Sequence, residues 1–86
     1  MPEVSRFFGI IIILYYNDHP PPHFHVRYGP QKAIVDIQNL AILQGYLSNR
    51  VFNLVKEWAT EHQAELLENW ELARKAQPLE PIDPLE

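Results

Sequence analysis

Residues 7–28 read FFGIIIILYYNDHPPPHFHVRY, and this stretch decides the fold of the 86-residue chain. Its first ten residues are apolar or aromatic and do not alternate with polar ones, which is typical of a strand covered on both faces. We therefore expect a central strand at residues 8–16. Asn17, Asp18 and three consecutive prolines end it, because Asn and Asp favour turns and proline cannot donate to a sheet ladder.

A β-hairpin is predicted next, in residues 23–38. Along residues 23–28 two sets of side chains alternate, namely Phe24, Val26 and Tyr28 on one face and His23, His25 and Arg27 on the other. Residues 29–32 predict a turn with proline at its second position, and residues 33–38 alternate again as a further strand. Matching the apolar faces pairs His25 with Asp36 and His23 with Gln38.

Helical spacing of apolar residues marks the C-terminal half. Residues 39–47 predict a short strand or an irregular link, and Ser48 is a typical helix N-cap. One unbroken helix over residues 48–76 would be about 43 Å long, whereas a globule of this size is only about 30 Å across. We therefore expect a break near residues 60–63, followed by an extended Pro-rich tail at residues 77–86. The tail packs on its own domain or docks a partner or a second copy.

These patterns predict a single α+β domain over residues 1–86. Its β half is residues 1–47, an antiparallel sheet of three to four strands. Its helical half is residues 48–76, two helices or one kinked helix packed on one face of the sheet. A chain of 86 residues has room for one core only.

Composition narrows the class of protein. The chain has no cysteine, which excludes disulfides and thiolate metal sites. No secretory signal is evident, and the longest apolar run is about half the length of a membrane-spanning helix, so we expect a cytoplasmic protein with no membrane partner. Residues 1–46 are electrically balanced, and the whole net charge of −4 comes from residues 47–86. This balance disfavours nonspecific nucleic-acid binding but leaves RNA contact by the β half open.

Three histidines around the proline turn form the main functional signal. His23 and His25 share a strand face, and His19 lies across the turn and can supply a third nitrogen. Asp18 or Asp36 can add a carboxylate. Two or three histidines and a carboxylate around an open position suit a divalent metal ion, either zinc or ferrous iron.

A metal-free site explains the same residues equally well. Asp36 beside His25 would orient the imidazole and raise its basicity, as in an acid–base pair. Arg27 on the same face can hold a phosphate or carboxylate. Base-assisted RNA cleavage needs no enzyme nucleophile, which keeps a small ribonuclease among the candidates. In a third interpretation the histidines only organise the turn.

Several motifs resemble one known family. They are Ser5-Arg6-Phe7-Phe8-Gly9, Tyr15-Tyr16-Asn17-Asp18-His19, Pro21-Pro22-His23-Phe24-His25, Glu57-Trp58-Ala59 and Leu66-Leu67-Glu68-Asn69-Trp70-Glu71-Leu72-Ala73. In these motifs the chain resembles the bacterial family called domain of unknown function 4160. Pro20, a third proline, departs from the family pattern.

The resemblance implies a small stand-alone protein encoded beside a second small protein, of the family called domain of unknown function 2442, in an arrangement like a toxin–antitoxin operon. The leading hypothesis is accordingly an interaction module of such a pair. This chain would be its candidate toxin and the histidine face its working surface. The neighbouring gene product is the expected partner, with self-association as a further option. The alternatives are a small hydrolase, metal-dependent or metal-free, and a purely structural protein.

Overall fold

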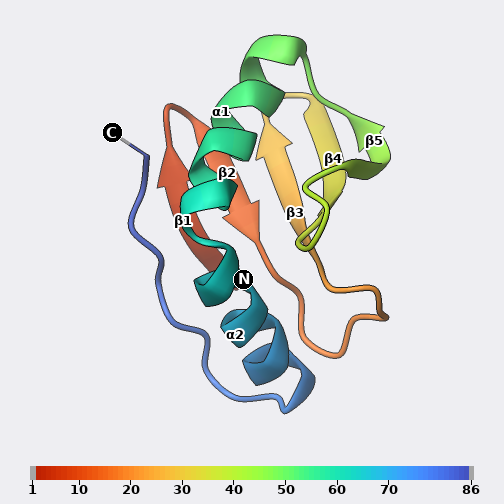
Figure 1. Ribbon diagram of the computed structural model, residues 1–86, viewed down its shortest axis with the longest axis vertical. Coiled ribbons are helices and arrows are strands. Elements are labelled where there is room, and N and C mark those ends of the chain that lie inside the picture. The colour runs from red at the N-terminus through yellow and green to blue at the C-terminus, as the bar shows by residue number, and fades with distance from the viewer. Residues whose placement is uncertain (1, 86) are drawn as a thin grey trace.

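The computed structural model describes residues 2–85 and contains one sheet followed by two helices (Figure 1). The elements are β1 (Glu3–Phe7), β2 (Ile10–Ile13), β3 (His23–Tyr28), β4 (Gln31–Asp36), β5 (Ile42–Tyr46), α1 (Asn49–Glu61) and α2 (Gln63–Arg74). Each strand pairs antiparallel with the one before it, so the sheet order is β1-β2-β3-β4-β5. The α+β class is confirmed, and the sheet has five strands where three to four were predicted.

The first hairpin corrects the predicted strand at residues 8–16. Phe8 and Gly9 form a tight turn with φ of 50° and 80°, and they separate β1 from β2. Phe7 pairs with Ile10 across this turn. Two-residue turns of this kind need positive φ at both central positions and are usually made by Asn, Asp or Gly. A phenylalanine in one of these positions concealed the turn within an otherwise apolar run.

The second hairpin is tighter than predicted. Its loop is Gly29–Pro30 alone, with Gly29 at φ +55°. The register is therefore shifted by two residues, so that His25 lies opposite Ile34 and His23 lies opposite Asp36. The predicted pairing of His25 with Asp36 was wrong. An even shift keeps every side chain on its predicted face, because the faces of a strand alternate with a period of two.

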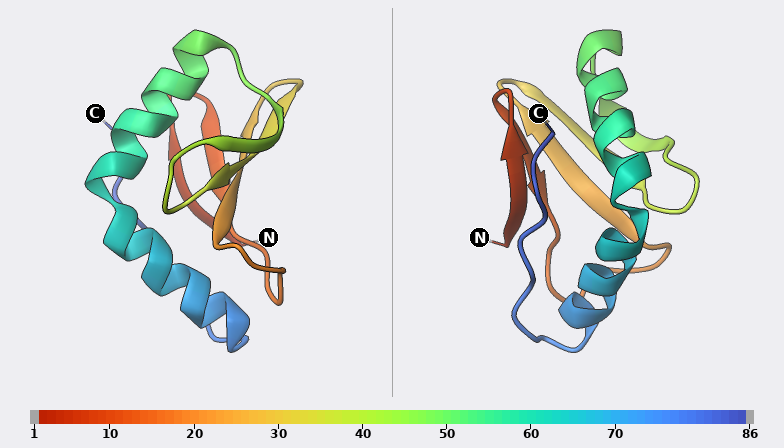
Figure 2. Two further views of the ribbon diagram at one scale, coloured as in Figure 1. Left: turned by 45° about the vertical axis from the view of Figure 1, so that its right-hand side comes forward. Right: turned by 60° about the vertical axis from the view of Figure 1, so that its left-hand side comes forward.

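Both helices pack on one side of the sheet (Figure 2). The helical segment bends at His62, within the predicted break. Ser48 is the N-cap of α1, and its Oγ accepts from the Val51 N–H at 3.4 Å. Trp58 lies at the centre of the core and is fully buried, with its ring centroid 5.3 Å from that of Phe7. Burial of one such aromatic side chain contributes about 1.5–3 kcal/mol.

Residues 77–85 form neither helix nor strand and run along the outer edge of β1 (Figure 1). Asn69 on α2 holds them by two reciprocal bonds: its Nδ2 donates to the Glu80 carbonyl at 2.9 Å, and its Oδ1 accepts from the Glu80 N–H at 2.8 Å. The Ile82 N–H donates to the Val4 carbonyl at 2.8 Å. Residues 77–85 thus contact their own domain.

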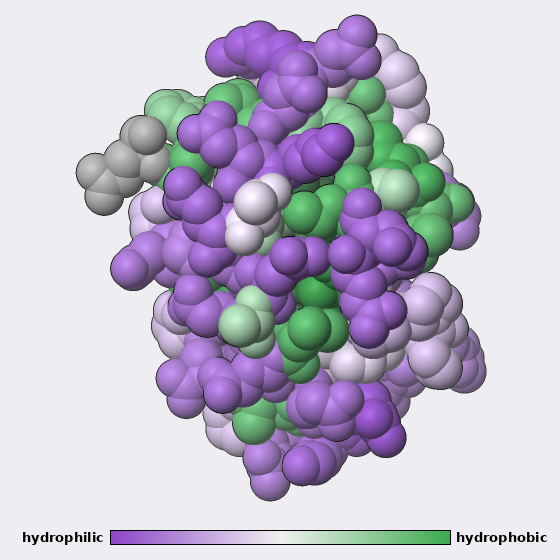
Figure 3. Space-filling model, in the orientation of Figure 1, coloured by the Kyte–Doolittle hydropathy of each residue, from purple (hydrophilic) through white to green (hydrophobic). Residues whose placement is uncertain are grey.

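The two faces of the molecule differ in character. The helix-bearing face is mostly hydrophilic (Figure 3) and carries the exposed acidic residues Glu57, Glu61, Glu65, Glu68 and Glu71. The opposite face of the sheet has no helix on it (Figure 2). Within residues 2–85, none of the helices combines the length and the apolar character that crossing a bilayer requires.

Candidate functional site

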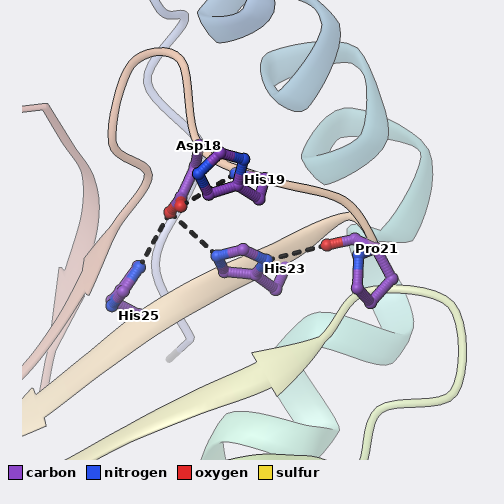
Figure 4. Close-up of polar contacts among 5 residues, drawn as sticks. All are labelled: Asp18, His19, Pro21, His23 and His25. Atoms are coloured by element: carbon purple, nitrogen blue, oxygen red, sulfur yellow. Dashed lines mark hydrogen bonds and ion pairs between the residues drawn. The ribbon is translucent and has the colours of Figure 1, made fainter.

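The loop between β2 and β3 brings Asp18 over the start of β3. Asn17 has a φ of 56°, a conformation that Asn adopts more readily than most residues. Its backbone N–H donates to the Ala73 carbonyl of α2 at 3.3 Å. The His19 N–H donates to Asp18 Oδ1 at 3.0 Å. These contacts direct the Asp18 carboxylate towards β3 (Figure 4).

Asp18 Oδ2 lies between two imidazoles (Figure 4). It is 2.8 Å from His23 Nε2 and 3.2 Å from His25 Nε2. The residue His23 is buried, with 8% of its surface exposed, whereas the side chains of Asp18 and His25 are 26% and 25% exposed. The three side chains therefore form a cluster that is closed on the His23 side and reachable from solvent on the His25 side.

Aromatic rings fix the orientation of both imidazoles. The Trp70 ring of α2 lies 5.0 Å from the His23 ring, and the Tyr15 ring stands edge-on to the His25 ring at 4.6 Å. On its other side the His23 ring is held by the Pro21 carbonyl, 2.7 Å from Nδ1. The ring nitrogens that face Asp18 are thus set by packing as well as by hydrogen bonds.

The contacts of His23 decide the electrostatics of the cluster. A carbonyl oxygen can only accept, so His23 Nδ1 must carry a proton and donate it to Pro21. In a neutral imidazole the remaining nitrogen, Nε2, is then an acceptor that faces the acceptor Oδ2 of Asp18 at 2.8 Å. Two lone pairs repel at that distance unless a cation lies between them. That cation is either a proton or a metal ion.

The Asp18 carboxyl is acidic in this setting. Partial burial raises its pKa, but hydrogen bonding with the two imidazoles and with the His19 backbone N–H outweighs that effect. The pKa of Asp18 consequently lies below its usual value of 3.8. The cluster therefore presents a carboxylate near neutral pH.

The structure brings together some of the predicted site residues and separates others. His23, His25 and Asp18 form the cluster described above. Asp36 lies across from His23 in the backbone register, but its Oδ1 accepts from the Gln38 N–H at 2.8 Å, so that it caps the turn after β4. His19 contributes its backbone N–H, and its ring is outside the group of ligand atoms.

Arg27 lies beside the cluster and lines a cavity on the uncovered face of the sheet. The cavity has a volume of about 240 Å³, and Tyr15, His25, Arg27, Lys32 and Gln44 are among its lining residues. The sequence pattern predicts Lys32 in a turn and indicates no role for Gln44. A predicted loop of two residues, Gly29 and Pro30, would have identified Lys32 as a site residue, because the resulting register places Lys32 opposite Arg27.

Comparison with known protein families gives one match. The model of the family described as domain of unknown function (DUF4160) matches residues 9–71, which is more than half of the chain. The chain belongs to this family. No curated protein and no solved structure matches the chain. The DUF4160 match includes the Asp18, His23 and His25 positions but says nothing of a neighbouring gene, so the two-gene module stays a prediction.

Proposed function

We propose that Asp18, His23 and His25 bind one divalent metal ion and that this centre is hydrolytic. The observation that supports the proposal is the pair of contacts at His23. Nδ1 donates to the Pro21 carbonyl, and Nε2 then faces the Asp18 carboxylate at 2.8 Å. Histidines that bind metals typically donate their second ring N–H to a carbonyl or a carboxylate, which fixes the tautomer. His23 has this arrangement.

The donor set fits zinc or ferrous iron. Two imidazole nitrogens and one carboxylate oxygen are ligands that both metals accept. Metal–ligand bonds of about 2.0–2.1 Å place the ligand atoms of a tetrahedral site about 3.3 Å apart. The separation of 3.2 Å between His25 Nε2 and Asp18 Oδ2 meets this value. His23 Nε2, at 2.8 Å from the same oxygen, must withdraw by about half an ångström.

Three protein ligands would leave one coordination position of the metal open for water or substrate. A zinc site with three protein ligands keeps a position for water or substrate, and the bound ion supplies Lewis-acid chemistry and a more acidic water. The exposed sides of Asp18 and His25 give that position access to solvent. In the hydrolysis, the water oxygen bonds to the electrophilic atom and the bond to the leaving group breaks. The water proton ends on the leaving oxygen.

The test is the metal content of untagged protein purified without a chelating column. After stripping with chelator and reloading, we expect one equivalent of zinc, and with cobalt(II) the visible absorption of a low-coordinate N/O site. D18N and H25N should each lower the affinity for the metal. Loss of a group that only orients a metal ligand typically lowers the affinity by about 10–100-fold, so loss of a ligand itself should cost at least about tenfold.

H19N and H62N are matched controls, because each removes an imidazole that lies outside the cluster. Both should keep one equivalent of metal. Wild-type protein without stoichiometric metal, or D18N protein that binds as well as wild type, would overturn the proposal. The cation beside Asp18 would then be a proton, and the cluster an acid–base pair.

A further inference from the structure

Two cross-strand rows of side chains run over the uncovered face of the sheet. The first row is Ile13, His25, Ile34 and Gln44, and it contains His25, the more exposed of the two histidine ligands of the proposed metal centre. The second row is Ile11, Arg27, Lys32 and Tyr46. On β3 the two rows are two residues apart, about 6.6 Å along the strand. A cationic row therefore lies directly beside the cluster.

Arg27 and Lys32 are directly opposite each other in the register. Like charges in this position destabilise a sheet. In the part of the chain that the structure describes, no carboxylate forms an ion pair with either of them. Both side chains line the cavity of about 240 Å³. A bound anion would offset this repulsion, so the charges of the pair favour an anion at this site.

Aromatic side chains flank this anion site. Tyr15 lines the cavity next to His25 and is 37% exposed, and Tyr46 follows Lys32 in the cationic row and is 66% exposed. Single-stranded nucleic acids bind where cations follow the backbone and aromatic rings stack on unpaired bases. Cations between two exposed tyrosines provide both elements on one face.

The acidic net charge does not oppose this assignment. The excess negative charge belongs to residues 47–86, and five of its carboxylates are exposed on the helices, on the opposite side of the sheet. The described strands β2, β3 and β4 carry Arg27 and Lys32 on the uncovered face. Asp36 at the end of β4 is buried and bonded to its own turn. Asp18 adds one carboxylate beside His25, so with neutral histidines the two cations Arg27 and Lys32 still leave an excess of positive charge around the cavity.

We infer that the uncovered sheet face, through Arg27 and Lys32, binds the phosphodiester backbone of a single-stranded nucleic acid and presents it to the Asp18–His23–His25 centre. This assignment rests on the proposed function for its chemistry and names the substrate class. One phosphate sits between Arg27 and Lys32, and the next one lies over His25. In the reaction, water oxygen bonds to phosphorus, one P–O ester bond breaks, and the proton goes to the leaving oxygen. Water is the only co-reactant.

The test is fluorescence anisotropy with labelled single-stranded RNA and DNA oligonucleotides of about eight nucleotides, in chelator and with added zinc. The double variant R27Q/K32Q is compared with R50Q/K56Q, which makes the same two changes on α1. Two phosphate contacts give a log–log salt slope of about −1.4 for single strands. We expect R27Q/K32Q to lose this slope and about tenfold or more in affinity, whereas R50Q/K56Q behaves as wild type.

Three outcomes would overturn the inference: no binding by wild type, equal losses in the two double variants, or a mononucleotide that binds as tightly as the oligonucleotides. Preference for RNA or for DNA identifies the natural source and supports the inference in either case. Thermal unfolding checks that R27Q/K32Q is folded, and removal of the like-charge pair should not lower its stability.

Failure of this inference and failure of the metal proposal are distinguishable. Anisotropy in chelator measures the anion site without metal, and metal analysis of R27Q/K32Q measures the centre without the anion site. Loss of oligonucleotide binding with one equivalent of metal retained assigns Arg27 and Lys32 to substrate binding. Wild-type protein that binds oligonucleotide but no metal would overturn the metal proposal and leave the assignment of Arg27 and Lys32 to nucleic-acid binding in place.

Discussion

Replacing Asn69 with alanine should loosen the attachment of the C-terminal segment to the domain. Asn69 is 1% exposed, and its amide makes two bonds to the backbone of Glu80, one as donor at 2.9 Å and one as acceptor at 2.8 Å. The variant removes both partners of Glu80 at once. Two further bonds hold the segment, from the Ile82 N–H to the Val4 carbonyl and from Trp58 Nε1 to the Asp83 carbonyl.

The magnitude follows from these contacts. A hydrogen bond contributes about 0.5–1.5 kcal/mol net, so the two bonds of Asn69 are worth about 1–3 kcal/mol. Glu80 is exposed, and water can replace part of each bond, which favours the lower half of that range. For a domain of this size a loss of 1 kcal/mol lowers the Tm by about 4–8 °C. Urea unfolding and calorimetry measure the free energy and the Tm.

Asn53 provides the matched control, because it is an exposed asparagine on α1. N53A should change the free energy of unfolding by less than about 0.5 kcal/mol. A chain shortened to residues 1–76 should be destabilised by at least as much as N69A. If the shortened chain is as stable as wild type, the contacts of the segment contribute nothing and the reasoning fails.

Three other predictions concern the centre and the backbone. Zinc at one hundred times its Kd should stabilise the fold by about 2.7 kcal/mol and raise the Tm by about 10–20 °C, an effect that calorimetry should show to be absent in D18N. G45A should lower the free energy of unfolding in urea more than G29A does. Both glycines have positive φ, but a Cβ on Gly45 would overlap the backbone of β4, whereas a Cβ on Gly29 would enter open space. Equal losses in the two variants would contradict this explanation. S48A should lose about 0.5–2 kcal/mol, because it removes the N-cap of α1, and an unchanged unfolding midpoint would show that the cap is not needed.

Local patterns predicted the elements whose signals lie within a few residues. The alternation at residues 23–28 gives β3 with its observed bounds, and the N-cap at Ser48 follows from helix chemistry. The break at His62 follows from the length of the helical segment compared with the size of the domain. One strand, β1, was missed, and β5 lies within residues 39–47, where a short strand was one of the two expectations. The turns before β2 and before β5 are both unusual. The turn at Phe8–Gly9 has an aromatic residue at positive φ, and β5 begins after Leu40, another apolar residue at positive φ.

In the candidate site, too, local patterns predicted some features, and others depended on the turns. Spacing alone puts His23 and His25 on one face, because every second residue of a strand shares a face. Their carboxylate partner depends on loop lengths instead. The sequence offered Asp18 and Asp36 equally, and the hairpin register argued for Asp36. The short loop at Gly29–Pro30 sets a register in which Asp36 does not face His25. The hydrogen bond from the Asn17 N–H to the Ala73 carbonyl of α2 holds the loop so that Asp18 lies beside His25 instead.

The two-residue shift in the register of β3 and β4 affects two kinds of prediction differently: the face on which a side chain lies, and the neighbour that it has across the strands. Because the shift is even, it left each side chain on its predicted face, and the assignment of a polar, histidine-bearing face survived. Because neighbours across the strands changed, an expected His25–Asp36 pair became two separate features: a cluster around Asp18 and a cationic pair of Arg27 with Lys32. In the predicted register Arg27 would have faced Ile34, because that register pairs His25 with Asp36. The observed register places Lys32 opposite Arg27 instead, so two cations lie side by side next to the cluster, which is the arrangement that an anionic substrate requires.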